Sequence, residues 1–150
     1  DAKNYSFGHE TLVRLRPAQD LNVNLGYTFT KSYDGSTCSN LGDTTCNEPI
    51  NVRIPIHSFS SSLVKKFDKN FTASAQYKYI GERRDYGGSD NNFKSVMLHE
   101  YSLINLSTDY KVNDYKINLT IKNLFDTNYT EAWGYNTPGR NLNFKFGKQF

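Results

Sequence analysis

Apolar and polar side chains alternate along most of this chain, and that alternation limits what the chain can fold into. From Leu21 to Phe29 every odd position is apolar and every even position is small or polar. The stretches 71–79, 115–122 and 142–147 repeat the pattern. Successive side chains of a strand point to opposite faces, so each stretch would have one apolar and one polar face. The pattern therefore predicts an all-β chain built from amphipathic strands.

Seven strands are expected, and the segments between them alternate between short and long. The expected strands are residues 5–16, 20–33, 52–67, 71–85, 98–111, 115–125 and 140–150. Tight turns made of ordinary turn residues are expected at 17–20, 68–70 and 112–114. Long polar loops are expected at 34–50, 86–97 and 126–139. In an antiparallel up-and-down sheet, this order places the tight turns at one end and the long loops at the other.

The third expected strand is the least regular. Its apolar phase shifts between Ile56 and Phe59, near His57, which predicts a bulge or a strand end there.

Strand length and loop asymmetry favour a transmembrane barrel over a secreted sandwich. A membrane strand needs about 9–11 residues, whereas soluble strands average about 5–6, and most of the expected strands reach or exceed the longer value. Bacterial outer-membrane barrels combine short periplasmic turns with long extracellular loops. A secreted β-sandwich explains the alternation but neither of these features. We therefore expect an antiparallel up-and-down transmembrane β-barrel segment. Bacterial barrels have even strand numbers, so earlier strands are expected before Asp1.

Composition excludes several other classes of protein. Aromatic residues make up 15% of the chain, with 11 Tyr and 10 Phe, which favours strands. No stretch approaches the roughly 18 consecutive apolar residues of a transmembrane helix. The net charge is only +3 and the basic residues are scattered, so nucleic acid is not an expected partner.

No motif for catalysis, a metal or a cofactor is present, so an enzyme is not expected. There is no nucleophile elbow, P-loop or dinucleotide fingerprint. Asp85 and Asp90 flank a Gly-Gly pair, but a lone acidic loop of this kind is more often solvated than a calcium site. The histidines stand far apart in the sequence, without metal-ligand spacing: His9, His57 and His99.

Cys38 and Cys46 are the only cysteines, and both lie in a polar stretch rich in Gly, Ser, Thr and Asn. A disulfide in a surface loop, formed in an oxidising compartment, is the preferred interpretation. A pair of free thiols is the alternative. Without a histidine nearby, the two cysteines are weak support for zinc.

The chain ends on an aromatic residue, Phe150, and Phe146, Phe144 and Leu142 are expected on the same face. Lys148 is the one break in this apolar face. A last strand of this kind resembles the C-terminal signature of outer-membrane barrel proteins, although any edge strand can end on Phe. In that group the barrel-assembly machinery reads the last strand before it closes against the first.

The stretch 121–140 is similar to the C-terminal hallmark of TonB-dependent outer-membrane receptors. Stretches 16–29, 52–57, 79–85 and 101–106 resemble further motifs of that family and occur in the family's order, with Asn105 where Asp is common. The residues that match the C-terminal hallmark are Asn123, Leu124, Phe125, Asp126, Tyr129, Gly134, Tyr135, Pro138, Gly139 and Arg140.

The resemblance implies that residues 1–150 are the C-terminal portion of a 22-stranded barrel, without the plug domain and the earlier strands. The implied function is import of a scarce nutrient across the bacterial outer membrane, with a cobalamin receptor as the nearest type and a siderophore receptor next. The long loops would form part of the ligand vestibule. A small passive barrel, porin-like or adhesin-like, and a secreted β-sandwich that acts as a binding module are the alternatives.

The resemblance also implies partners. These are outer-membrane lipid, the rest of the same barrel and its plug, TonB through the absent N-terminal part, the barrel-assembly machinery through the last strand, and a small-molecule nutrient.

Structural roles are expected for the hallmark residues. Gly134, Pro138 and Gly139 would set the geometry of a turn. Arg140 would pair with a carboxylate inside the barrel. An aromatic girdle at the membrane interface would include Tyr129, Trp133 and Tyr135. Polar side chains facing the plug or the lumen would be Asn22, Asn24, Gln76, Lys78, Asn118, Lys122, Asn143 and Lys145.

Overall fold

The computed structural model describes residues 4–34, 52–88, 92 and 94–149. Its strands are β1 (Asn4–Ala18), β2 (Leu21–Asp34), β3 (His57–Lys66), β4 (Phe71–Ile80), β5 (Arg83–Tyr86), β6 (Ser95–Leu98), β7 (Tyr101–Val112), β8 (Tyr115–Lys122) and β9 (Asn141–Lys148). Seven of them form one antiparallel sheet in the order β1-β2-β3-β4-β7-β8-β9, and β5 pairs with β6 in a separate hairpin. No helix in the described part of the chain has the length and apolar character needed to cross a membrane.

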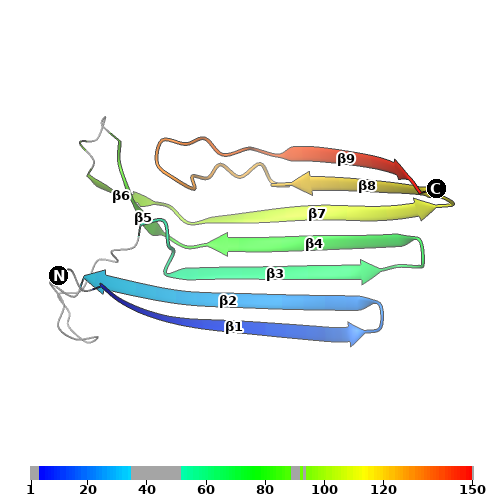
Figure 1. The fold of residues 1–150 in the computed structure, drawn as a ribbon, viewed down its shortest axis with the longest axis horizontal. Coiled ribbons are helices and arrows are strands. Elements are labelled where there is room, and N and C mark those ends of the chain that lie inside the picture. Colours follow the sequence, from blue (N-terminus) through cyan, green and yellow to red (C-terminus); the bar gives the residue numbers. More distant parts are fainter. Residues whose placement is uncertain (1–3, 35–51, 89–91, 93, 150) are drawn as a thin grey trace.

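The connections lie as the sequence predicts. The short turns β1–β2, β3–β4 and β7–β8 gather at one end of the sheet, and the longer connections gather at the other, here called the loop end (Figure 1). In the β3–β4 turn the Asp68 carboxylate accepts hydrogen bonds from the backbone N–H groups of Asn70 (2.6 Å) and Phe71 (2.8 Å). In the β7–β8 turn Asn113 has a φ of 51°, a left-handed conformation that asparagine tolerates. The up-and-down arrangement of seven strands is therefore confirmed.

The predicted strand bounds that differ by three residues or more from the structure all lie at the loop end. The third strand begins at His57 rather than at residue 52, which identifies the phase shift there as a strand end. The fourth strand ends at Ile80 rather than at residue 85. The N–H of Gly81 donates to the carbonyl of His57 (2.9 Å), and beyond that contact the chain leaves the sheet to form the β5–β6 hairpin.

Further predictions at the loop end are also wrong. The segment predicted as a loop at 86–97 contains β6, and the next sheet strand begins at Tyr101 rather than at residue 98. The strand predicted at 115–125 ends at Lys122, because Asn123 adopts a φ of 50°. Phe150 and most of the predicted loop 34–50, including Cys38 and Cys46, lie outside the described residues.

The register of the sheet brings most apolar residues of its strands onto one face, because paired residues in an antiparallel sheet share a face. Leu12, Val64 and Leu103 are exceptions that lie on the opposite face. A central row of this apolar face is aliphatic from edge to edge. Its members, each paired with the next, are Leu15, Val23, Leu63, Ala75, Leu106, Ile121 and Leu142. Aromatic rows flank it on both sides. Toward the loop end lie Tyr27, Phe59 and Tyr79, and toward the turn end lie Phe71, Tyr110, Tyr115 and Phe146.

The opposite face is polar and carries small side chains that bond to one another. The Nδ2 of Asn24 donates to the hydroxyl of Ser62 (3.2 Å), and the hydroxyls of Ser107 and Thr120 lie 2.9 Å apart. The residues that the sequence assigns to the inner side all share this polar face: Asn22, Asn24, Gln76, Lys78, Asn118, Lys122, Asn143 and Lys145.

The sheet has no hydrophobic core of its own. Within the described residues, only Leu98 and Tyr101 are buried apolar side chains, whereas Leu15 is 48% and Phe144 is 65% exposed. The edge strands β1 and β9 each pair on one side only. A single sheet with an exposed apolar face and two open edges is incomplete by itself. Its apolar face requires lipid or a further protein layer.

Candidate functional site at the loop end of the sheet

A buried carboxylate joins three separate segments at the loop end. Asp85 of β5 is only 1% exposed. Its two oxygens accept hydrogen bonds from the Nε of Arg53 at 3.0 and 3.1 Å. They also accept hydrogen bonds from the backbone N–H groups of Trp133 and Tyr86, each at 2.8 Å. One side chain thereby holds together the segment before β3, the β5–β6 hairpin and the loop between β8 and β9.

The electrostatics of Asp85 favour its ionised form. Burial raises the pKa of the Asp85 carboxyl, but the hydrogen bonds from the N–H groups of Trp133 and Tyr86, with the Arg53 guanidinium, outweigh burial and hold the pKa below its ordinary value. Asp85 is therefore ionised at neutral pH, and its bonds to Arg53, Tyr86 and Trp133 are here called the Asp85 latch.

The sequence-based expectation of a solvated acidic loop is wrong for Asp85, while Asp90 lies outside the described residues. From Gly81 to Gly87 every odd residue is buried and the even ones lie further out. This alternation has the period of a strand, but the residues turned inward are Gly, Arg, Asp and Gly. Hydropathy misses the signal because the buried side is polar.

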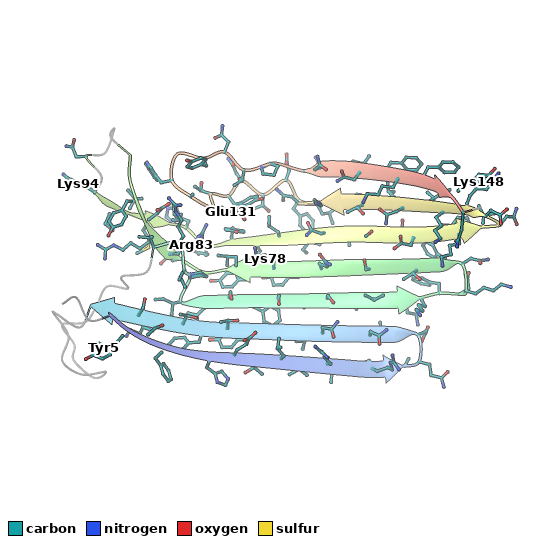
Figure 2. The ribbon with its side chains drawn as sticks, in the orientation of Figure 1. Tyr5, Lys78, Arg83, Lys94, Glu131 and Lys148 are labelled. Atoms are coloured by element: carbon teal, nitrogen blue, oxygen red, sulfur yellow. The ribbon has the colours of Figure 1, made fainter. Side chains whose placement is uncertain are left out.

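Arg83 is a second buried charge, two residues before Asp85. Its side chain is 4% exposed and donates to the backbone carbonyls of Gly81 (3.4 Å), His99 (3.3 Å) and Thr130. The guanidinium also lies 5.1 Å from the centre of the Tyr101 ring, within cation–π range. Figure 2 shows Arg83 at the loop end, where β5 leaves the sheet. Arg83 thus fixes the two points at which the hairpin departs from the sheet and returns to it.

Aromatic packing connects the residues around Arg83 and Asp85 to the loop between β8 and β9. The rings of Tyr101 and Tyr129 lie 4.6 Å apart, and the Tyr101 hydroxyl donates to Oε1 of Glu131 (3.3 Å). Burial, and secondarily the Glu131 carboxylate, raise the pKa of Tyr129. Tyr101 pairs with Ile80 on the polar face, so Tyr129 does not join an aromatic girdle on the apolar face. The girdle placement of Trp133 and Tyr135, which are 37% and 72% exposed, stays a prediction.

The hallmark residues shape the loop that follows β8. Asn123 is 4% exposed and exchanges hydrogen bonds with the backbone of Thr127, from its Nδ2 to the carbonyl (2.9 Å) and from the Thr127 N–H to its Oδ1 (2.8 Å). The N–H of Arg140 donates to Oδ1 of Asp126 (2.6 Å), which closes the loop just before β9.

The expected pairing of Arg140 with a carboxylate inside the barrel stays a prediction. Its guanidinium lies 3.5 Å from the carbonyl of Leu124, and no carboxylate of the described residues forms an ion pair with it. The backbone N–H of Arg140, not its side chain, reaches a carboxylate.

Two features of this region could receive a ligand. A cavity of about 340 Å³ lies between β6 and the β8–β9 loop, lined by Met97, Leu98, His99, Glu100, Asn128, Tyr129, Thr130 and Trp133. One ligand atom from each of Glu82, His99 and Glu100 lies within 4.8 Å of the others, so these three exposed side chains could hold a divalent cation. Sequence reasoning missed both, because the residues converge only through the hairpin.

Substituting alanine for Gly81 is expected to destabilise the loop end. A Cβ at position 81 would lie 2.8 Å from the carbonyl oxygen of His57, the atom that accepts the Gly81 N–H. Both clashing groups are backbone, so neither can rotate away, and a loss of about 1–3 kcal/mol is expected for such overpacking. Urea unfolding of the protein in detergent would measure it. Gly147→Ala is the control, because a Cβ there meets nothing within 4 Å; equal effects would contradict the clash.

Comparison with known proteins identifies the fold. No family model matches this sequence. The pyoverdine outer-membrane receptor FpvA of Pseudomonas aeruginosa, bound to pyoverdine, matches with a TM-score of 0.79 and 19% identity over 99% of this chain and 22% of the receptor. The ferric-catecholate import receptor Fiu of E. coli K12, in its closed form, matches with a TM-score of 0.73 and 20% identity over 99% of this chain and 21% of the receptor. The FrpB iron transporter of Neisseria meningitidis matches with a TM-score of 0.70 and 16% identity over 97% of this chain and 24% of the transporter.

The chain thus spans between a fifth and a quarter of the length of these proteins. At these identities the likeness establishes the fold. The seven-stranded sheet and its up-and-down order have the fold of part of an outer-membrane receptor, as the sequence predicts.

Proposed function

We propose that this chain is the C-terminal part of the barrel wall of a TonB-dependent receptor, which imports a scarce nutrient through the bacterial outer membrane. One observation carries the proposal. A single sheet pairs a continuous aliphatic row, flanked by aromatic rows, with a polar opposite face, and its fold matches iron receptors over 97–99% of its length. A barrel wall in lipid requires this division, because a charged side chain facing the bilayer midplane costs about 2–4 kcal/mol.

The charged residues of the apolar face agree with this assignment. Lys31 lies near the loop end of β2, whereas Lys65 and Lys148 lie near the turn end. Lys65 pairs with Asp20 of the β1–β2 turn, and the Nζ of Lys148 lies 5.6 Å from the centre of the Tyr115 ring. Figure 2 shows Lys148 at the turn end of the sheet. Long basic side chains at the two rims of an apolar band reach the interface, where their charge is hydrated.

A ferric siderophore is the proposed nutrient class, ahead of cobalamin. The matched proteins include a pyoverdine receptor, a ferric-catecholate import receptor and an iron transporter. The loop-end cluster around Asp85 and the cavity beside Trp133 would lie on the extracellular side, where they would form part of the vestibule that receives the ligand.

Deleting the gene that encodes this chain is expected to abolish energy-dependent uptake of one nutrient. Growth would be measured under iron limitation with a panel of ferric siderophores as the sole iron source, and under cobalamin limitation in parallel. The matched control is a strain that retains the gene but lacks TonB, and both strains should lose the same substrate. Uptake that survives the loss of TonB would instead indicate a passive barrel. Recovery of the protein in the soluble fraction without detergent would contradict any membrane role.

A further inference from the structure

The β5–β6 hairpin is joined to the sheet by a neck in which strand pairing is interrupted (Figure 1). Sheet pairing stops where β4 and β7 separate, and it resumes where β5 and β6 meet. The neck consists of Gly81 and Glu82 on one side and of His99 and Glu100 on the other. Three of these four residues therefore carry side chains that can bind a metal ion.

The three side chains converge although they come from opposite sides of the neck. One ligand atom from each of Glu82, His99 and Glu100 lies within 4.8 Å of the others. Ligands of a single Zn²⁺ ion lie about 2.0–2.2 Å from it, which places any two of them at most about 4.4 Å apart. Small rotations of these exposed side chains would therefore bring all three onto one ion.

The backbone of the neck is held in place from its buried side. The Arg83 side chain, which is 4% exposed, donates to the carbonyls of Gly81 (3.4 Å) and His99 (3.3 Å), one on each side of the neck. The N–H of Gly81 also donates to the carbonyl of His57 (2.9 Å). The separation of the two sides is thus fixed before an ion binds, as a preorganised site requires.

The two carboxylates of the neck lie close together without a cation to balance them. Neither Glu82 nor Glu100 takes part in an ion pair with another described residue. The nearby Arg83 guanidinium is directed at backbone carbonyls and at the Tyr101 ring instead. Because like charges at this separation repel, a bound divalent cation would remove an unfavourable interaction.

The histidine selects the class of cation. Ca²⁺ and Mg²⁺ are bound through oxygen ligands, whereas imidazole suits zinc and other transition metals. Three protein ligands leave one position of a four-coordinate Zn²⁺ ion for water or another donor. His99 and Glu100 also line the cavity of about 340 Å³, which provides room for that fourth ligand.

We infer that Glu82, His99 and Glu100 bind a divalent transition-metal ion of the Zn²⁺ type, which fastens the two sides of the hairpin neck to each other. All three ligands belong to this chain, so the inference does not depend on the transport function proposed above. The bound ion would replace the missing strand pairing of the neck and would restrict the movement of the hairpin relative to the sheet.

Zinc binding to the full-length protein, purified in detergent and freed of metal with a chelator, tests the inference. Isothermal titration calorimetry would measure the Zn²⁺ affinity with Ca²⁺ and Mg²⁺ in excess. Glu82→Gln and His99→Gln each remove one ligand, from opposite sides of the neck, and each should weaken binding at this site by at least about tenfold. The matched control is His9→Gln, which removes an exposed histidine of β1 and should leave the affinity unchanged.

Hydrogen exchange at the amides of Glu82 and Glu100 provides the second measurement. We expect Zn²⁺ to slow this exchange in the native protein and in His9→Gln, but not in the two ligand variants. The gel mobility of the folded barrel would show that each variant folds, and the second ligand variant keeps the test decisive if the first does not. Unchanged affinity in the ligand variants, or neck amides that do not respond to Zn²⁺, would overturn the site. Preference of the neck for Ca²⁺ over Zn²⁺ would overturn the class of metal.

Discussion

Arginine in place of Ala75 is expected to lower the free energy of unfolding in a bilayer by about 2–4 kcal/mol, whereas arginine in place of Gln76 is expected to have little effect. Ala75 belongs to the aliphatic row, between Leu63 and Leu106. A cation there would face the hydrocarbon of the bilayer far from either rim. Gln76 is the next residue of β4 and is exposed on the polar face, where a cation stays hydrated.

The pair of variants separates the direction of the side chain from every other consequence of adding arginine. Both positions lie in the middle of the same strand and have the same neighbouring strands. Urea titration of the protein refolded into lipid vesicles, followed by the gel mobility of the folded barrel, would measure the two free energies. Equal losses would mean that the apolar face is not in lipid. A larger loss at Gln76 would mean that the two faces have been assigned the wrong way round.

The second large effect is expected for Asp85→Asn, which should loosen the contacts that hold the β8–β9 loop and the segment before β3 against the β5–β6 hairpin. The Asp85 carboxylate accepts four hydrogen bonds from the Arg53, Tyr86 and Trp133 donors, and neutral asparagine can replace only part of that set. Leaving a buried donor without a partner costs about 1–3 kcal/mol. We expect faster hydrogen exchange at the Trp133 amide and faster proteolysis of the β8–β9 loop, with the strands of the sheet unchanged.

The pH dependence of the latch follows from the direction of its pKa shift. The pKa of Asp85 is lower in the folded protein than in the unfolded chain, so its stabilisation is complete above an ordinary Asp pKa of about 3.9. That stabilisation is lost as the pH falls through the lowered folded-state value. Protection of the Trp133 amide should therefore persist at pH 5 and disappear only in stronger acid. Asp85→Asn should show no such acid transition. Asp20→Asn, in the turn at the other end, serves as the control and should leave this amide unaffected.

Arg53 lies in a conformation that the sequence pattern does not predict. The stretch 52–57 was expected to start a sheet strand, but Arg53 has a φ of 64°, and its N–H donates to the carbonyl of Arg84 (2.7 Å). That bond links residues 31 positions apart, which no local pattern encodes. The contact between Trp133 and Asp85 spans a larger separation still.

The sequence by itself determined the number of strands in the seven-stranded sheet and their up-and-down order. It did so because those properties depend on neighbours two positions apart and on turns of a few residues, both of which can be seen in a local window. Its alternation also assigned the members of the apolar and polar faces correctly across β2, β4, β8 and β9.

Only the tertiary structure decided where the strands end and what happens beyond them. At the loop end, polar groups satisfy one another across long sequence separations, so the burial of Arg83, Asp85 and Asn123 leaves no hydrophobic trace in the sequence. The position of Lys111 directly opposite Lys116 likewise became evident only from the register of β7 and β8. Hydrophobic burial leaves a periodic pattern that can be read along a chain, whereas the pairing of charges and hydrogen bonds depends on which distant residues meet.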